Sequence, residues 1–251
     1  MQDIIEVILG WPDAIKGFEI NALAGYLNKS LHRNVTKAEI DAAMAQLRDL
    51  ERVDSERGVH YLTEPDRPEL DLYAPLEAAF QASGVFAALG IDRHEWVFQK
   101  TATSGVRSAG RLSMPDFTLA AIRSWRFDPR RSLEVYSFEV KRRAGTSLAS
   151  VYEAVAHGRF IHHPYLVCPR SVLEPLQNAQ LKTACAREGV GLIFFDIVVD
   201  PFKNFRLERL EVIEKAVRRT PDPQEVEAYL SKRLTAANCL ALESIVKGAQ
   251  A

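Results

Sequence analysis

The pattern of apolar and polar positions predicts a small helical region at the beginning of the chain. Amphipathic helices, in which apolar residues recur every three or four positions, are predicted at residues 3–9 and 20–31. Thr36 and Glu39 have the spacing of a capping box, and the apolar stripe that follows predicts a third helix. Two short strand patterns come next, at residues 52–53 and 58–62. We therefore expect residues 1–65 to form one small domain of three helices and a hairpin.

A second, longer region has the pattern of an α/β domain. It follows a linker at residues 64–68, whose two prolines disfavour both helix and sheet. Helices are predicted at residues 69–89, 147–160 and 173–188. Strands are predicted at residues 96–100, 117–122, 133–141, 165–168 and 191–196. Because two helices separate the last three strands, we expect a central mixed sheet flanked by helices over residues 66–200. Residues 201–251 are predicted to be a C-terminal helical extension.

The strand pattern at residues 133–141 carries the clearest chemical signal in the chain. Residues i and i+2 of a strand share a face, so Ser137, Glu139 and Lys141 are expected to point the same way. The alternate positions are apolar and can be buried. A carboxylate and an amine side by side, backed by an apolar face, suit a site that holds a divalent cation and manages a proton.

Composition narrows the class of protein. The 251 residues are 47% hydrophobic and 26% charged, as in a soluble globular protein. No run approaches the roughly 20 apolar residues of a membrane span, and the acidic start is unlike a signal peptide, so we expect a cytoplasmic protein without a membrane partner. The three cysteines are widely spaced and predict neither a disulfide framework nor a zinc site. The adjacent His162 and His163 are expected to be loop residues.

The net charge of −1 conceals a regional asymmetry. Residues 1–65 contain 7 Lys and Arg against 11 Asp and Glu, whereas residues 101–143 contain 9 against 4. The basic surplus thus surrounds the Glu139 strand, as a site for a polyanion would require. A solvated charged face is the plainer interpretation of the same residues.

Two motifs mark the ends of neighbouring predicted strands. Pro115-Asp116 precedes one predicted strand, and Glu139-Val140-Lys141 ends the next one, with Glu139 23 residues after Asp116. With the order of elements, these motifs resemble the PD-(D/E)XK nuclease superfamily, which has the restriction-endonuclease-like fold, over roughly residues 69–200. A Pro-Asp pair is common in this chain, but Glu139-Val140-Lys141 is its sole acidic-x-Lys triplet. The specificity of the resemblance rests on that triplet.

The resemblance implies a Mg²⁺-dependent endonuclease that hydrolyses DNA. Asp116 and Glu139 would be metal ligands together with the Val140 carbonyl, and Mn²⁺ would substitute for Mg²⁺. Lys141 would position or help to deprotonate the attacking water and stabilise the phosphate. Such families often place a further acid on the preceding helix, where Glu77 is the first candidate and Glu69 the second.

Basic residues are the candidates for contact with nucleic acid. In the nuclease-like region they are Arg107, Arg111, Arg142 and Arg143. The first 65 residues resemble a winged helix-turn-helix domain, whose basic turn and following helix start contain Lys29, Arg33 and Lys37. Because this domain is acidic overall, two roles stay open for it: DNA contact, or binding of a protein partner. Glu153 and His157 share a helix face, where they either flank the cleft or make structural hydrogen bonds.

These observations favour a metal-dependent endonuclease acting on double-stranded DNA, in a restriction or genome-defence role. A homodimer is expected if both strands are cut, because two related phosphates call for two related sites. The alternative is a non-catalytic winged-helix regulator with a nuclease-like fold that binds nucleic acid or protein. RNA is a weaker substrate candidate, because the aromatic stacking surfaces of single-strand readers are not evident.

Overall fold

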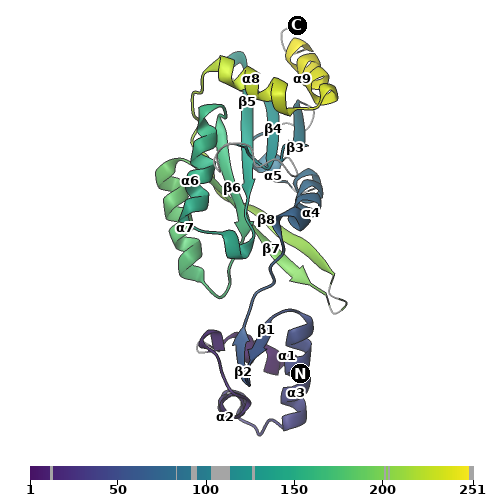
Figure 1. Cartoon of the computed structure of the whole chain (residues 1–251), viewed down its shortest axis with the longest axis vertical. Helices are drawn as coiled ribbons and strands as arrows, with labels where there is room; N and C mark the ends of the chain where they lie inside the picture. Colours follow the sequence, from purple (N-terminus) through teal and green to yellow (C-terminus); the bar gives the residue numbers. More distant parts are fainter. Residues whose placement is uncertain are drawn as a thin grey trace. The chain divides into compact units, whose positions relative to one another are not determined.

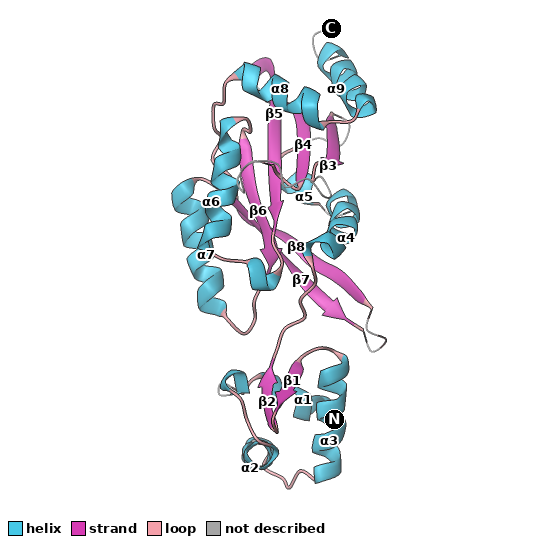
Figure 2. Cartoon of the chain, in the orientation of Figure 1, coloured by secondary structure: helices cyan, strands magenta, loops and turns pink. Residues whose placement is uncertain are grey.

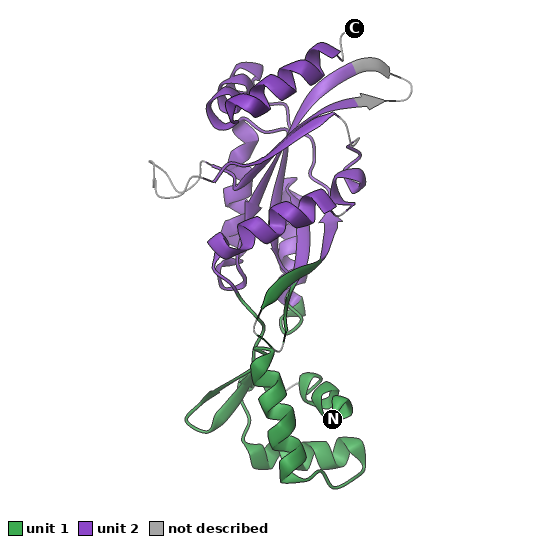
Figure 3. Cartoon of the chain, turned by 90° about the vertical axis from the view of Figure 1, so that its right-hand side faces the viewer, with its two compact units in different colours: residues 1–66, 171–175, 197–208 green, residues 67–170, 176–196, 209–251 purple. Residues whose placement is uncertain are grey.

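The computed structural model describes residues 1–11, 14–82, 84–91, 95–102, 114–125, 128–200, 202 and 204–248. The chain divides into two compact units, shown in green and purple in Figure 3. Unit 1 contains residues 1–66, 171–175 and 197–208, and unit 2 contains residues 67–170, 176–196 and 209–251. None of the helices in the described part of the chain has the length and apolar character that a bilayer crossing needs.

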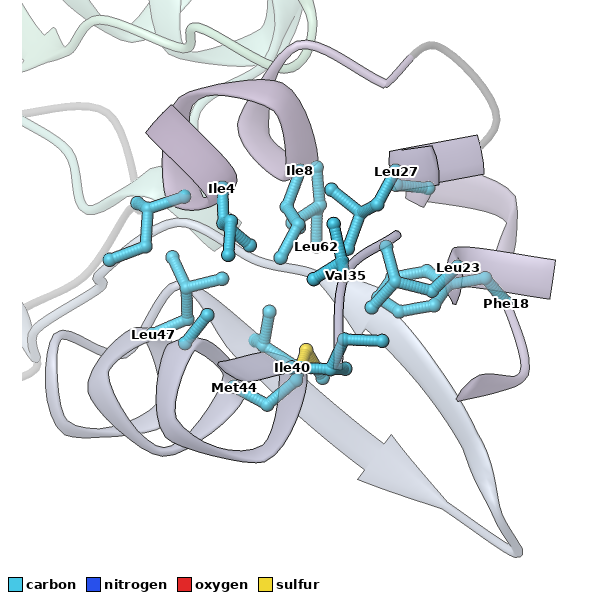
Figure 4. Packing of buried hydrophobic residues seen from close by; sticks show 14 residues of the cluster. Ile4, Ile8, Phe18, Leu23, Leu27, Val35, Ile40, Met44, Leu47 and Leu62 are labelled. Carbon is cyan, nitrogen blue, oxygen red and sulfur yellow. The ribbon is translucent and has the colours of Figure 1, made fainter. Parts of the chain in front are cut away.

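Unit 1 is built from three helices and an antiparallel hairpin. The helices are α1 (Gln2–Leu9), α2 (Ile20–Leu31) and α3 (Lys37–Asp49), with a short 3₁₀ turn at Ala14–Lys16. The hairpin strands are β1 (Val53–Glu56) and β2 (Val59–Leu62). The predicted capping box is confirmed, because Thr36 accepts from the backbone N–H of Glu39 and the Glu39 carboxylate accepts from that of Thr36. Side chains from all three helices and both strands fill one apolar core (Figure 4).

Unit 2 contains most of a mixed six-stranded sheet, of which residues 197–199 and 205–208 in the last two strands are assigned to unit 1 (Figure 1). Its strands, in spatial as well as chain order, are β3 (Trp96–Lys100), β4 (Phe117–Trp125), β5 (Asp128–Val140), β6 (His163–Pro169), β7 (Gly191–Val199) and β8 (Phe205–Glu214). β4 is antiparallel to both of its neighbours, β3 and β5, while β5, β6 and β7 are parallel. Parallel neighbours need crossover connections, which α6 (Leu148–Ala156) and α7 (Pro175–Glu188) supply. The predicted α/β class and mixed sheet are confirmed.

Helices cover both faces of this sheet (Figure 2). On one face, Phe80 of α4 (Glu69–Ala82) packs against aromatic rings of the sheet, with its ring centroid 4.8 Å from that of Phe138. On the other face, α6 and α7 pack apolar side chains on β6 and β7. The same face is covered farther along by α8 (Pro223–Arg233) and α9 (Ala236–Gly248). The polar face of β5 therefore lies beneath α6.

Several element predictions differ from the structure, and His163, predicted to be a loop residue, begins β6. The predicted helix at residues 69–89 is two helices, α4 and then α5 (Val85–Ala88). The strand around Glu139 begins at Asp128 and ends at Val140. Residues 205–214, expected within a helical extension, form strand β8. The alternation of β8 is interrupted because Arg209 has a backbone φ of 50°, which shifts the apolar positions from Phe205 and Leu207 to Leu210 and Val212.

Candidate active site

The candidate site lies where β5 ends beside the start of β4. These strands are antiparallel, and their register pairs Phe117 with Phe138, so that continuing it brings Asp116 opposite Glu139. The backbone supports this placement, because the N–H of Asp116 donates to the Phe138 carbonyl at 3.1 Å. Asp116 and Glu139 are both buried. Two acidic residues 23 positions apart in sequence are thus brought together by strand pairing.

Asp116 is held by hydrogen bonds from two elements. Its Oδ1 accepts from the Tyr73 hydroxyl at 2.6 Å, and Tyr73 belongs to α4. Its Oδ2 accepts from the backbone N–H of Val140 at 2.7 Å. Burial raises the pKa of Asp116 to about 6, although both hydrogen bonds counteract the rise. The carboxylate is therefore fixed in orientation, and its burial outweighs the hydrogen bonds and the charge of Lys141 that favour the charged form.

Lys141 joins Glu139 to the crossover helix α6. Its Nζ lies 2.6 Å from Glu139 Oε1 and 2.6 Å from Glu153 Oε2. Burial lowers the pKa of Lys141, but the two carboxylates outweigh this and raise the pKa above its ordinary value. Lys141 is thus a cation held between two carboxylates. The predicted shared face of Glu139 and Lys141 is confirmed by this contact.

Only one of the two carboxylate oxygens of Glu139 has a hydrogen-bond partner. Oε1 accepts from Lys141, whereas Oε2 is buried and has no hydrogen-bond partner. Burial and the neighbouring Asp116 raise the pKa of Glu139 to about 8, outweighing the lowering effect of Lys141. A buried acceptor without a partner is costly, and a bound cation would remove that cost.

His157, in the 3₁₀ turn that follows α6, lies on the same buried face. Its Nδ1 is 3.2 Å from the hydroxyl of Ser137, and its Nε2 is 3.6 Å from Glu139 Oε2. Burial, followed by the charge of Lys141, lowers the pKa of His157 to about 3, so the ring is neutral. Of the two alternatives for His157, the structural hydrogen bond is present, and the ring also faces the candidate site.

The donor set is compatible with a divalent cation, although it is sparse. Among the described residues, no group of three or more His, Cys, Asp or Glu side chains is arranged to hold a metal ion. Asp116 and Glu139 nevertheless provide carboxylate oxygens, one of them without a partner. Mg²⁺ commonly binds through one or two carboxylates and keeps several waters or phosphate oxygens. Two protein carboxylates are therefore a sufficient set for this class of ion.

The acid on α4 that acts on the site is Glu69. Its charge raises the pKa values of both Asp116 and Lys141. Glu77 is half-buried two turns further along the helix. It takes no part in the hydrogen bonds and ion pairs given for Asp116, Glu139 and Lys141. Tyr73, one turn before Glu77, contacts Asp116 directly and carried no sequence signal.

The predicted nucleic-acid contacts are spread over both units. In unit 2, Arg142 is exposed, and Arg143 donates to the Arg170 carbonyl at 2.9 Å. In unit 1, Lys29 and Lys37 are exposed, whereas Arg33 pairs with Glu39 at 2.9 Å. The predictions for Arg107 and Arg111 lie outside the described residues.

Comparisons with known proteins identified no relative of this chain. A scan of family models gave no match to the chain. Searches of the curated proteins and of solved structures gave none either. The functional argument therefore rests on the geometry around Asp116, Glu139 and Lys141.

Proposed function

We propose that this protein is a metal-dependent endonuclease that hydrolyses phosphodiester bonds in double-stranded DNA. One observation carries the proposal: Asp116, Glu139 and Lys141 meet in one buried cluster in which Glu139 Oε2 lacks a partner. Most buried polar atoms in proteins have a hydrogen-bond partner, so an unpartnered carboxylate oxygen beside a second carboxylate and a lysine favours a site that takes a ligand. Unit 2 would have the restriction-endonuclease-like fold, with Pro115-Asp116 and Glu139-Val140-Lys141 as its PD-(D/E)XK motif.

The charges of the cluster suit phosphodiester hydrolysis. The carboxylates of Asp116 and Glu139 would hold Mg²⁺ or Mn²⁺, together with the Val140 carbonyl and water. When bound, the cation would offset phosphate charge and activate water. Lys141 would orient the attacking water and stabilise negative charge on the phosphate, because its ammonium group is already positioned beside Glu139.

DNA is favoured as the substrate by the basic side chains that lie near the cluster in the sequence. Residues 101–143 have a surplus of basic side chains, and Arg142 next to Lys141 is exposed. The three helices and hairpin of unit 1 support a winged-helix domain that selects the target or a protein partner. Because Arg33 already pairs with Glu39, the exposed Lys29 and Lys37 are its better phosphate contacts. This combination suits a restriction or genome-defence enzyme, and a homodimer would place one site on each strand.

Cleavage of plasmid DNA with Mg²⁺ or Mn²⁺ tests the proposal. The variants are Asp116→Asn, Glu139→Gln and Lys141→Met, which change charge with little change in volume, and their alanine counterparts. Glu227→Gln and Lys232→Met, exposed on α8, are matched controls. We expect the three site variants to lose at least about 100-fold in cleavage rate, and the controls to cut like the wild type.

Two outcomes would contradict the nuclease proposal. Wild-type cutting by all three site variants would show that the cluster is not the cleavage centre. Absence of any heat of Mn²⁺ binding in calorimetry, together with absence of cleavage, would favour a non-catalytic winged-helix regulator.

A further inference from the structure

Among its described residues, unit 2 contains two buried His–Glu pairs that differ in one respect. In the first, His163 Nε2 lies 3.0 Å from Glu134 Oε2, a hydrogen-bonding distance. The same carboxylate also accepts from Arg218 through both oxygens and from Ser132. Every oxygen of Glu134 therefore has a partner. This pair is a complete structural network.

The second pair, His157 and Glu139, is incomplete. Its two facing atoms, His157 Nε2 and Glu139 Oε2, are 3.6 Å apart, which is too long for a hydrogen bond. Glu139 Oε2 is buried and unpartnered, while Oε1 is occupied by Lys141. His157 is itself buried, with a relative exposure of 1%. A nitrogen and an oxygen thus face each other with no group between them.

That separation fits two ligands of one metal ion. Ligand atoms about 2.1 Å from a shared ion lie about 3.0–3.6 Å apart when their angle at the metal is about 90–120°. The Ser137 hydroxyl beside Nδ1 orients the ring from behind, as outer-shell partners of metal-binding histidines do. The imidazole is held with Nε2 toward the open carboxylate oxygen.

We propose that His157 Nε2 joins Glu139 Oε2 in binding the divalent cation, as a facing pair rather than as part of a preformed cluster of three side chains, so that the site prefers Mn²⁺ or Co²⁺ to Mg²⁺. The preference follows from ligand chemistry, because imidazole binds later first-row ions well whereas Mg²⁺ strongly favours oxygen ligands. This inference rests on the proposed function for the identity of the cation site, and its test separates the two.

The test measures cation binding rather than cleavage. Wild-type protein is loaded with Mn²⁺, and pulsed electron paramagnetic resonance is used to detect coupling of the ion to ¹⁴N. Calorimetric titrations with Co²⁺ and Mg²⁺ give the ratio of the two affinities. The same measurements are made on His157→Asn, with His163→Asn as the matched control from the complete pair, and thermal unfolding checks that each variant is folded.

We expect nitrogen coupling in the wild type and in His163→Asn and its loss in His157→Asn, with the Co²⁺ to Mg²⁺ affinity ratio falling about tenfold or more. Mn²⁺ binding to the wild type without nitrogen coupling would overturn the inference and leave the nuclease proposal standing, whether or not His157→Asn folds. Coupling that persists in His157→Asn would also overturn it. Failure to bind any of the three cations would overturn both proposals.

Discussion

The hydroxyl of Tyr73 donates a 2.6 Å hydrogen bond to Asp116 Oδ1, which ties helix α4 to the first carboxylate of the candidate site. Tyr73→Phe removes the donor and leaves a buried carboxylate oxygen with one fewer partner, so we expect a loss of about 1–3 kcal/mol in the free energy of unfolding. Urea unfolding measures it. Tyr152→Phe, at a half-exposed tyrosine on α6, should change the same quantity by less than about 0.5 kcal/mol. If Tyr73→Phe lowered the free energy of unfolding no more than Tyr152→Phe does, the Tyr73 hydrogen bond would not stabilise the fold.

Glu153 is expected to be a positioning residue for Lys141, whose Nζ it contacts at 2.6 Å. Glu153→Gln removes one of the two carboxylates that hold the ammonium group while leaving Glu139 in place. We expect the turnover rate to fall by up to about 100-fold, with little change in KM or in Mn²⁺ affinity. Steady-state cleavage kinetics and calorimetry measure the three quantities, and Glu227→Gln is the control. A fall in Mn²⁺ affinity equal to that of Glu139→Gln would instead make Glu153 a metal ligand.

The buried carboxylate of Glu134 should make stability depend on pH. Burial alone would raise the pKa of Glu134, but hydrogen bonds from His163, Ser132 and Arg218, together with nearby His162, lower it to about 2. Because the pKa of Glu134 is lower in the folded state, its charged form stabilises the fold. This stabilisation is complete at pH values above the unfolded-state pKa near 4.5, and it is lost progressively as the pH falls toward 2.

Comparison of the wild type with Glu134→Gln isolates this contribution. We expect the wild type to be more stable to urea at pH 5, and the difference to shrink by about 2 kcal/mol as pH falls below 3. A difference that stays constant over this pH interval would show that the charge of Glu134 is not stabilising.

The core of unit 1 gives a prediction that does not involve the candidate site. Leu27 is fully buried, so Leu27→Ala should destabilise unit 1 by about 2–5 kcal/mol. Thr36→Ala removes the N-cap of α3 and should cost about 1 kcal/mol. Hydrogen exchange measured on peptides locates the effects: protection should fall in residues 20–49 and stay unchanged in residues 148–199 that belong to unit 2. Equal loss of protection across the chain would mean that the two units unfold together.

Local patterns predicted most of the secondary structure because their physical causes are local. The capping box at Thr36 and Glu39 and the three- and four-residue spacing of residues 20–31 identified α3 and α2 with little error. Alternation identified the shared face of Glu139 and Lys141. Strand β8 was not predicted, because the left-handed backbone at Arg209 shifts the alternation of apolar and polar residues by one position, and because its side chains are only partly buried.

His163 shows the limit of reading residues one at a time. It is expected to be a loop residue from its neighbours in sequence, yet it begins β6 and is buried against Glu134, which lies 29 residues earlier. The partner that makes a buried histidine acceptable is distant in sequence. No local sequence pattern indicates that Glu134 is this partner.

By itself, the sequence determined the α/β class, most element positions and the pairing of a carboxylate with an amine at the end of β5, because periodicity and i, i+2 geometry are properties of neighbouring residues. Only the tertiary structure decided what surrounds that pair. Strand register brought Asp116 to Glu139, the crossover helix brought Glu153 and His157, and α4 brought Tyr73. Such contacts depend on how the elements pack, and the sequence of a helix face does not identify the strand on which that face will pack.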